Sequence, residues 1–353
     1  MILDRYIFRV VASATLAALL VLLLLESFLT LLAELEEVGK GGYDFAAMLR
    51  YLAMIQPQRL YEMFPMGLLV GGLLGMGALA GGSELIVMRA AGLSLTRLTR
   101  SALQTGLALS VVVLLIGEYA APQMEKAAKE QRAMAKSENV AIRGGRGFWA
   151  RDGDYLIHVR AVLPGIRLVD IHIFGIGPEA RLETITTARG ARYQEGRWLL
   201  EGIDRTTLNG DAVRNERLDQ LAVVSAISPR ILDVLAADPN DLSIRDLWVY
   251  VSYLERNGLD AQSYRLALWR KLLAPLSYLA MLVVGMPFVF GPQRSAGTGQ
   301  RLLVGLLLGL AFFMANYLLG NVVLLYGYPP LAGAILPSLL FLAAGFLALH
   351  RLR

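Results

Sequence analysis

Six predominantly apolar stretches, each about as long as a lipid bilayer requires, constrain this chain more than any other feature. About 20 apolar residues in a helix cross the hydrocarbon core. With 56% hydrophobic and only 18% charged residues, the chain is too apolar for an ordinary soluble domain. The sequence therefore predicts a membrane α-helical protein with six transmembrane helices, at about 6–32, 64–80, 102–121, 266–290, 302–326 and 330–349.

The charges that flank these stretches predict the orientation of the chain. Six spans place both termini on one side, and cytoplasmic segments of membrane proteins carry an excess of Arg and Lys. If the termini are cytoplasmic, the inside segments contain only two acids, Asp4 and Glu84. Against these stand Arg5, Arg9, Arg89, Arg97, Arg100, Arg294, Arg301, Arg351 and Arg353. We therefore expect both termini in the cytoplasm and the polar segment 122–265 outside it.

The segment 122–265 reads as an inserted domain. It holds 20 basic and 20 acidic residues, so the net charge of +5 comes from Arg beside the spans and does not indicate nucleic acid. Residues 123–137 are expected to extend the third span as a helix. Short alternating segments then predict strands at 147–150, 155–160, 168–174, 180–192, 197–201, 205–208 and 218–225.

Short strands separated by turns such as Asp152-Gly153 favour a small all-β sandwich or jelly roll. A helix at 242–257, ended by Gly258, should lead back to the fourth span. We thus predict three parts: 1–121 with the first three spans and a short cytoplasmic helix at 83–92, 122–265 as an all-β sandwich or jelly-roll domain with flanking helices outside the cytoplasm, and 266–353 with the last three spans.

The composition excludes much chemistry. The chain has no Cys and only three scattered His, which excludes disulfides, Cys-ligated zinc and thiol nucleophiles and gives no sign of a metal site. No phosphate-binding loop, nucleophile elbow or zinc-protease helix occurs in the sequence. We expect no catalytic residue and no bound cofactor. Energy for uphill transport would have to come from a partner or an ion gradient.

The cytoplasmic segment between spans two and three is a candidate contact with a motor protein. Ser83 is expected to cap a short helix, Glu84 suits its positive end, and Gly92 is a natural stop. Leu85, Met88 and Ala91 fall roughly on one face of that helix. The helix would either dock into a groove on the motor or lie on the lipid surface.

Small residues spaced four apart mark close helix packing. They occur at Gly67, Gly71 and Gly75 in span two, and at Gly305 and Gly309 in span five. Packing within the chain is favoured over a seam between subunits.

Several ionisable and polar residues lie inside the spans. Charges in hydrocarbon are costly, so they should face an interior, a cavity or the interface. Arg270 and Lys271 would either bind an anion or reach the outer headgroups. Phe312 and Asn316 share a stripe that would line a cavity or serve helix packing. Glu26 and Glu118 are the other ionisable residues inside the predicted spans.

Motifs spread over the whole chain resemble those of the lipopolysaccharide export permeases. They are Leu3-Asp4-Arg5-Tyr6, Phe64-Pro65-Met66, Ser83-Glu84-Leu85-x-Val87-Met88-x-Ala90-x-Gly92, Gly117-Glu118-Tyr119-x-Ala121-Pro122, Gly147-x-Trp149-Ala150-x-Asp152-Gly153, Phe290-Gly291-Pro292-x-Arg294-Ser295 and Tyr326-Gly327-x-Pro329-Pro330.

The resemblance implies a permease subunit in the inner membrane of a Gram-negative bacterium, with 122–265 as a periplasmic β-jelly-roll domain. Such a subunit pairs with the paralogous permease LptF above an LptB dimer that binds ATP and Mg. LptC joins the complex, and lipopolysaccharide passes through jelly rolls to LptA. The segment 83–92 then corresponds to the coupling helix. Its contact residues would be Ser83, Glu84, Leu85, Val87, Met88, Arg89, Ala91 and Gly92.

The resemblance also implies contacts with the phosphorylated lipid. Family members carry several basic residues at the outer end of span one, whereas this chain has Glu34, Glu36 and Glu37 there, with Lys40 as the single base. Capture would need other cations or a divalent ion that bridges acid and phosphate. The candidate contacts are Glu34, Lys40, Phe64, Arg270, Lys271, Phe312, Phe313 and Asn316.

Together these features predict an ATP-powered lipid extractor. Exposing acyl chains costs about 0.8 kcal/mol per methylene, so a continuous apolar path is required; Phe174 and other apolar strand residues are candidate lining. Two other classes stay open. An ion-coupled secondary transporter would show inverted repeats and ionisable residues at mid-membrane. A non-transporting scaffold would only recruit partners through its periplasmic domain.

Overall fold

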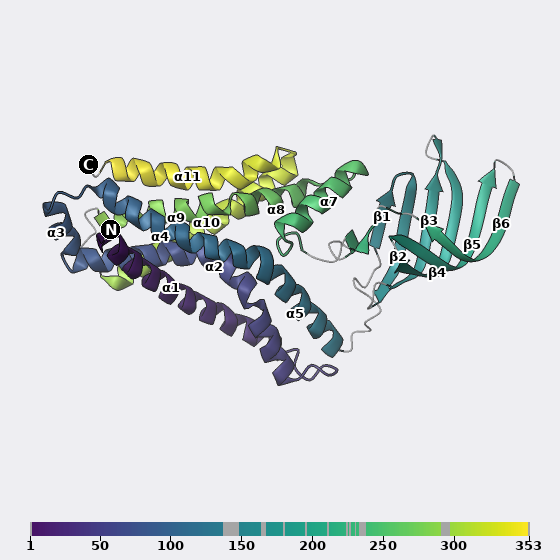
Figure 1. Ribbon diagram of the computed structural model, residues 1–353, viewed down its shortest axis with the longest axis horizontal. Coiled ribbons are helices and arrows are strands. Elements are labelled where there is room, and N and C mark those ends of the chain that lie inside the picture. The colour runs from purple at the N-terminus through teal and green to yellow at the C-terminus, as the bar shows by residue number, and fades with distance from the viewer. Residues whose placement is uncertain are drawn as a thin grey trace. The chain divides into compact units, whose positions relative to one another are not determined.

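The computed structural model describes residues 2–351 except 137–147, 164–166, 179–180, 195, 210–211, 224, 226, 230, 233–237 and 291–296. Two compact units make up the chain (Figure 1). The first, here called the membrane unit, comprises Met1–Val38, Phe45–Lys129 and Gln262–Arg353. The second, here called the insert unit, comprises Gly39–Asp44 and Glu130–Ala261.

Long apolar helices form the membrane unit. They are α1 (Ile2–Leu35), α2 (Phe45–Gly81), α4 (Leu95–Leu115), a π-helical turn η1 (Ile116–Ala120), α5 (Ala121–Ala135, whose last turns belong to the insert unit), α8 (Gln262–Leu272), α9 (Ala274–Phe290), α10 (Thr298–Tyr326) and α11 (Pro330–His350), with the short α3 (Glu84–Ala90). Figure 1 shows both chain ends at one end of this unit, which we call the proximal end. The opposite end is the distal end.

The predicted membrane-spanning character is confirmed, but the count of spans depends on one bend. Five helical stretches are long and apolar enough to cross a bilayer, and α8 with α9 makes a sixth if the bent pair is one span. The two helices meet at 57°. Pro275 explains the bend, because it has no N–H to donate and its ring clashes with the carbonyl of Lys271.

Helix α2 is longer than hydropathy predicts. It starts at Phe45 and not near Phe64, so the polar segment before the apolar stretch is also helical despite Pro57 and Pro65. This segment continues along α1, with which α2 makes the most extensive helix contact in the unit. Packing against a neighbour sustains a helix whose composition gives no membrane signal.

The two glycine stripes lie where helices of this chain approach closely. A Cβ at Gly67 would overlap Leu19, and a Cβ at Gly71 would overlap the backbone of Thr15, both on α1. On α10, Gly305 and Gly309 face Val70 and Met66 of α2 in the same way. Small residues thus set the spacing of α1 and α10 on α2.

The insert unit contains a six-stranded antiparallel sheet. Its strands are β1 (Phe148–Asp152), β2 (Tyr155–Leu163), β3 (Arg167–Ile176), β4 (Leu182–Gln194), β5 (Arg197–Asn209) and β6 (Ala212–Val223). The described strands follow one another in chain order, as in a meander, because each is joined to the next by a short connection. The all-β character is confirmed, whereas the jelly-roll topology is not.

One row of residues bends the sheet. Asp170 in β3 and Gly202 in β5 both have positive φ, 53° and 61°, and both lie opposite Arg189 in the register of β4. A residue in this conformation switches which side chains face the core. In β5 the buried Leu200 and Ile203 are therefore three residues apart. The two strands predicted at 197–201 and 205–208 are therefore one strand, β5, which bends at this row.

An apolar hollow of about 40 Å³ lies on one face of the sheet. It is lined by Ile157, Ile171, Trp198 and Leu200, among others, and the indole N–H of Trp198 donates to the carbonyl of Ile227 at 2.7 Å. Phe174, the lining residue expected from the sequence, is not part of it. Its ring stacks on His172 instead, because alternate residues of β3 face opposite sides of the sheet.

Helix α7 (Ile244–Arg256) confirms the helix predicted before the fourth span. The side-chain oxygen of Ser243 accepts a hydrogen bond from the N–H of Asp246, and Gly258 follows the helix with φ 65°. The Tyr253 hydroxyl donates to the carbonyl of Arg151 in β1 at 2.7 Å. Burial raises the pKa of Tyr253, so the hydroxyl stays a neutral donor at physiological pH.

The contact of α1 with α2 can be tested at Gly71. The added methyl of Gly71→Ala would overlap the Thr15 backbone, so we expect a loss of about 1–3 kcal/mol in stability. Gly81→Ala is the matched control, since no atom lies within 4 Å of its Cβ position. The measurement is thermal unfolding in detergent micelles, and equal midpoints for the two variants would contradict this packing.

Candidate functional site

The short helix α3 connects α2 and α4 at the proximal end. Ser83 does not cap it as predicted: its backbone is left-handed, with φ 62°, and its side chain makes no cap hydrogen bond. A capping residue usually has an extended backbone, from which its side-chain oxygen can accept a hydrogen bond from the helix N–H groups. The prediction that the Ser83 side chain caps this helix is therefore wrong.

The end of α3 follows the prediction. Gly92 has φ 88°, its N–H donates to the carbonyl of Arg89, and the N–H of Leu93 donates to the carbonyl of Met88. These two bonds form a Schellman motif, which glycine permits because it has no Cβ. The motif ends the helix and sends the chain into α4.

The two faces of α3 have different surroundings. Leu85 is only 4% exposed and belongs to the apolar core with Ile7 of α1 and Leu98 of α4. Met88 packs partly against the same core, so two of the three residues predicted to share a face are turned inward. Ile86 and Val87 are 50% and 67% exposed, which makes them the outward face. Arg89, Ala91 and Gly92 are exposed as well.

Polar contacts join the surroundings of α3 to α1. The Tyr6 side chain of α1 interacts with the carboxylate of Glu84. Nearby, Arg97 of α4 donates to Asp4 of α1 at 3.3 Å. Two residues of the opening motif, Asp4 and Tyr6, therefore hold the start of α1 against α3 and α4.

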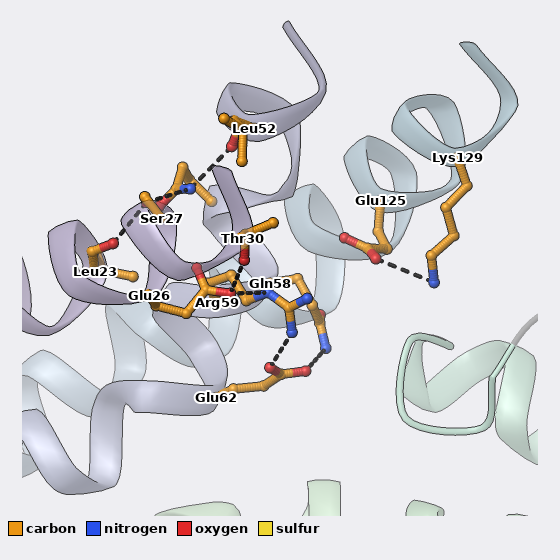
Figure 2. Close-up of polar contacts among 11 residues, drawn as sticks. Leu23, Glu26, Ser27, Thr30, Leu52, Gln58, Arg59, Glu62, Glu125 and Lys129 are labelled. Carbon is orange, nitrogen blue, oxygen red and sulfur yellow. Dashed lines mark hydrogen bonds and ion pairs between the residues drawn. The ribbon is translucent and has the colours of Figure 1, made fainter. Parts of the chain in front are cut away.

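A second group of polar residues lies toward the distal end, and we call it the ionic cluster (Figure 2). Arg59 of α2 makes ion pairs with Glu26 of α1 and Glu62 of its own helix, both at 2.9 Å. Thr30 donates to Glu26, and Gln58 donates to Glu62, each at 2.9 Å. One guanidinium thus pairs with two carboxylates, and its pair with Glu26 connects α2 to α1.

Helix lengths place the ionic cluster at the edge of the hydrocarbon. About 20 residues span the bilayer core, so a span that begins near Tyr6 leaves it near Leu25, directly before Glu26. Glu62 lies just before the apolar part of α2 in the same way. By this count the cluster lies toward one end of both apolar stretches, where a span approaches the lipid headgroups.

Sequence reasoning missed Arg59, Glu62 and Gln58. The sequence identifies Glu26 as a charge within a span. Its partner Arg59, however, lies before the predicted second span, on a part of α2 for which hydropathy predicts no helix. The signal available in the sequence was the spacing Arg59-x-x-Glu62, which places both charges on one helix face.

Beside the cluster, α5 and η1 add further polar groups. The buried Glu125 pairs with Lys129 at 3.1 Å (Figure 2). The π-helical turn η1 includes Gly117, where a side chain would overlap the ring of Tyr61. Pro122 follows one turn later and cannot donate a backbone hydrogen bond, which favours such a bulge.

The cations predicted in span four are held by the helices around the bend. Arg270 donates to the backbone carbonyl of Asn316 at 2.6 Å, and its guanidinium fills the space over Gly320. Lys271 is 6% exposed and its ammonium lies 5.3 Å from the centre of the Tyr61 ring. Both cations therefore have contacts within the protein.

The remaining predicted lipid contacts have mixed positions. Phe64 is 1% exposed and packs edge-on against Tyr278, and Phe312 packs likewise against Phe341, so both side chains lie in the core of this chain. Their contact with lipid stays a prediction. Phe313 and Lys40 are exposed, and Glu34 is buried.

The helices and the two polar groups define a class of protein: a multi-pass membrane protein with an inserted β-sheet, whose charges connect helices. Among the described residues, no group of three or more His, Asp or Glu could hold a metal ion. A family model described as lipopolysaccharide export system permease LptF/LptG matches residues 5–351. The chain belongs to this family.

Individual relatives agree with the family assignment. The lipopolysaccharide export system permease protein LptG of Haemophilus influenzae is 32% identical over 99% of each chain. LptG of Escherichia coli K12 is 33% identical over 96% of this chain and 95% of its own. LptF of Escherichia coli K12 is 26% identical over 89% and 85%. The predicted resemblance is thereby confirmed, with greater similarity to these LptG proteins.

The ionic cluster is testable by a double-mutant cycle. Arg59→Gln leaves two partly buried carboxylates uncompensated, and we expect a loss of about 3 kcal/mol in stability. Glu26→Gln in the same chain should recover part of this loss, because one unpaired charge is removed. Arg50→Gln, at an exposed position of α2, is the control. Additive effects of the two changes in thermal unfolding would contradict the pairing.

Proposed function

We propose that the protein is the permease subunit of an ATP-driven transporter that extracts lipopolysaccharide from the outer leaflet of the inner membrane. The membership in the LptF/LptG family and the names of the relatives support lipopolysaccharide as the substrate. The paralogous permease LptF is the proposed partner in the membrane. An LptB dimer would bind ATP and Mg, while this chain binds no cofactor.

The outward face of α3 is the observation that carries the coupling part of this proposal. Ile86 and Val87 form an exposed apolar pair at the proximal end, and the excess of Arg at this end supports a cytoplasmic position for it. Leu85 on the other face is buried in the apolar core to which α1, α2 and α4 also contribute. A motor that binds the outward face would therefore move these helices, because α3 cannot shift without its core contact.

The ionic cluster supports recognition of the lipid headgroup at the distal end. Arg59 lies where a span approaches the headgroups but is already paired with two carboxylates. A lipid phosphate would have to replace Glu26 or Glu62 to bind it. This exchange offers a way to capture a phosphorylated lipid although the outer end of α1 has few bases.

The apolar hollow of the insert unit supports a path for acyl chains toward a periplasmic bridge through LptC and LptA. Its lining residues are almost all apolar and come from one face of the sheet and from the segment that follows β6. At about 40 Å³ it would hold about three water molecules, so an acyl chain requires a wider opening than this state has.

The docking proposal is testable with a charge on α3. Val87→Asp should weaken binding of the ATPase about thirtyfold, because a carboxylate in an apolar contact costs about 2 kcal/mol or more. Ile2→Asp is the control, since it places the same charge on another exposed apolar residue of the proximal end. The measurements are copurification with LptB and LptF and ATP-driven release of lipopolysaccharide from proteoliposomes.

The outcomes separate the three function classes. Loss of copurification and release in Val87→Asp, with both retained in Ile2→Asp, supports the ATP-driven extractor. Release by the wild type without any ATPase would favour an ion-coupled transporter. Binding of the ATPase without ATP-driven release would favour a scaffold.

Glu84 needs its own pair of variants, because it interacts with Tyr6 of the same chain. If Glu84 serves mainly to contact the ATPase, Glu84→Ala should reduce release about tenfold or more, whereas Tyr6→Phe should leave it unchanged. Equal losses in the two variants would show that Glu84 acts by holding α3 on α1. The measurement is the same release assay, with the ATPase rate recorded in parallel.

A further inference from the structure

A groove at the proximal end lies between the start of α4 and the end of α11. Its volume is about 320 Å³, and all its lining residues come from these two helix ends. Figure 1 shows the end of α11 beside the start of α4. Both helices pack against α9, which keeps their ends in a fixed relation. The groove is separate from α3, the ionic cluster and the glycine stripes.

The lining is divided into an apolar part and a cationic part. The residues follow helical spacing, so each helix presents one face to the groove. On α4 these are Leu95, Thr96, Thr99, Arg100 and Leu103, and on α11 they are Phe346, Leu349 and His350. None of the eight is acidic. Arg100 and His350 are exposed, whereas Leu103 and Leu349 are partly buried.

The charges around the groove favour an anion. Within the described part of the chain, the neighbouring Arg97 pairs with Asp4, whereas no carboxylate pairs with Arg100. Arg351 adds a further exposed cation beside His350. The start of α4 also contributes the positive end of a 21-residue helix. The proximal end is the cytoplasmic side by the distribution of Arg, where anionic lipids face the protein.

We propose that this groove binds an anionic glycerophospholipid of the inner leaflet, with its phosphate at Arg100 and His350 and an acyl chain along Leu103, Phe346 and Leu349. Basic pockets between helices on the cytoplasmic side are the usual sites for such headgroups. The apolar part favours a lipid over free phosphate, because free phosphate has no apolar group to contact it. Phe346 is 59% exposed, so this part is open to the bilayer.

The position of the groove gives the bound lipid a function. Helix α4 begins five residues after α3 ends and carries Arg97, which holds α1. A lipid at Arg100 would join the start of α4 to the end of α11 and so hold the helix that directly follows α3. The composition of the inner leaflet would then influence how α3 is held.

The test is native mass spectrometry of the full chain from mixed micelles of phosphatidylglycerol and phosphatidylcholine with identical acyl chains. We expect bound phosphatidylglycerol in the wild type and about fivefold weaker binding in Arg100→Gln, the usual contribution of one Arg at a membrane surface. Arg100→Lys should retain most of the binding. Arg9→Gln is the matched control, because it removes an exposed cytoplasmic Arg outside the groove.

A photoreactive phosphatidylglycerol provides the second measurement. Its crosslinks should map to peptides that contain residues 95–103 and 346–351, and inorganic phosphate should not displace it. Equal binding by the wild type and Arg100→Gln would overturn the proposal, as would an equal loss in Arg9→Gln or crosslinks confined to other peptides. Displacement by inorganic phosphate would show a simple anion site and would overturn the assignment of a lipid.

Discussion

The close approach of α1 and α2 is the contact on which the membrane unit depends. Lipid tails are as apolar as Leu, so burial of apolar side chains gives little reason for helices to associate in a bilayer. Direct backbone contact does, and Gly71 permits it by leaving room for the backbone of Thr15. Because α2 also contacts α9 at Gly72 and α10 at Gly305, the unit is organised around this one buried helix.

Polar contacts then attach α1 to its neighbours at both ends. At the proximal end, Asp4 pairs with Arg97 of α4 and Tyr6 interacts with Glu84 of α3. At the distal end, Glu26 pairs with Arg59 of α2. Charges are tolerable at these depths because they lie at the edges of the hydrocarbon and have partners. Helix α1 therefore connects the surroundings of α3 with the ionic cluster.

The lengths and types of most elements could be predicted from the sequence, because the properties that decide them are local. Apolar stretches of membrane length predicted helices, and alternation predicted strands. Glycine predicted where helices end, as Gly92 and Gly258 show. Errors arose where a neighbour in space decides. The helix before Phe64 forms along α1, the bend at Pro275 divides a stretch of continuous hydropathy, and Ser83 adopts a left-handed turn in place of a cap.

By itself the sequence determined that this protein crosses a membrane, carries a β-rich insert, ends α3 at Gly92 and resembles one permease family. Only the tertiary structure decided which residues meet. It turned Leu85 inward and Val87 outward, buried Phe64, and brought Arg59 to Glu26 across 33 positions of the chain. The physical reason is that hydropathy and periodicity act along the chain, whereas ion pairs, close helix contacts and the order of strands depend on partners that folding brings together.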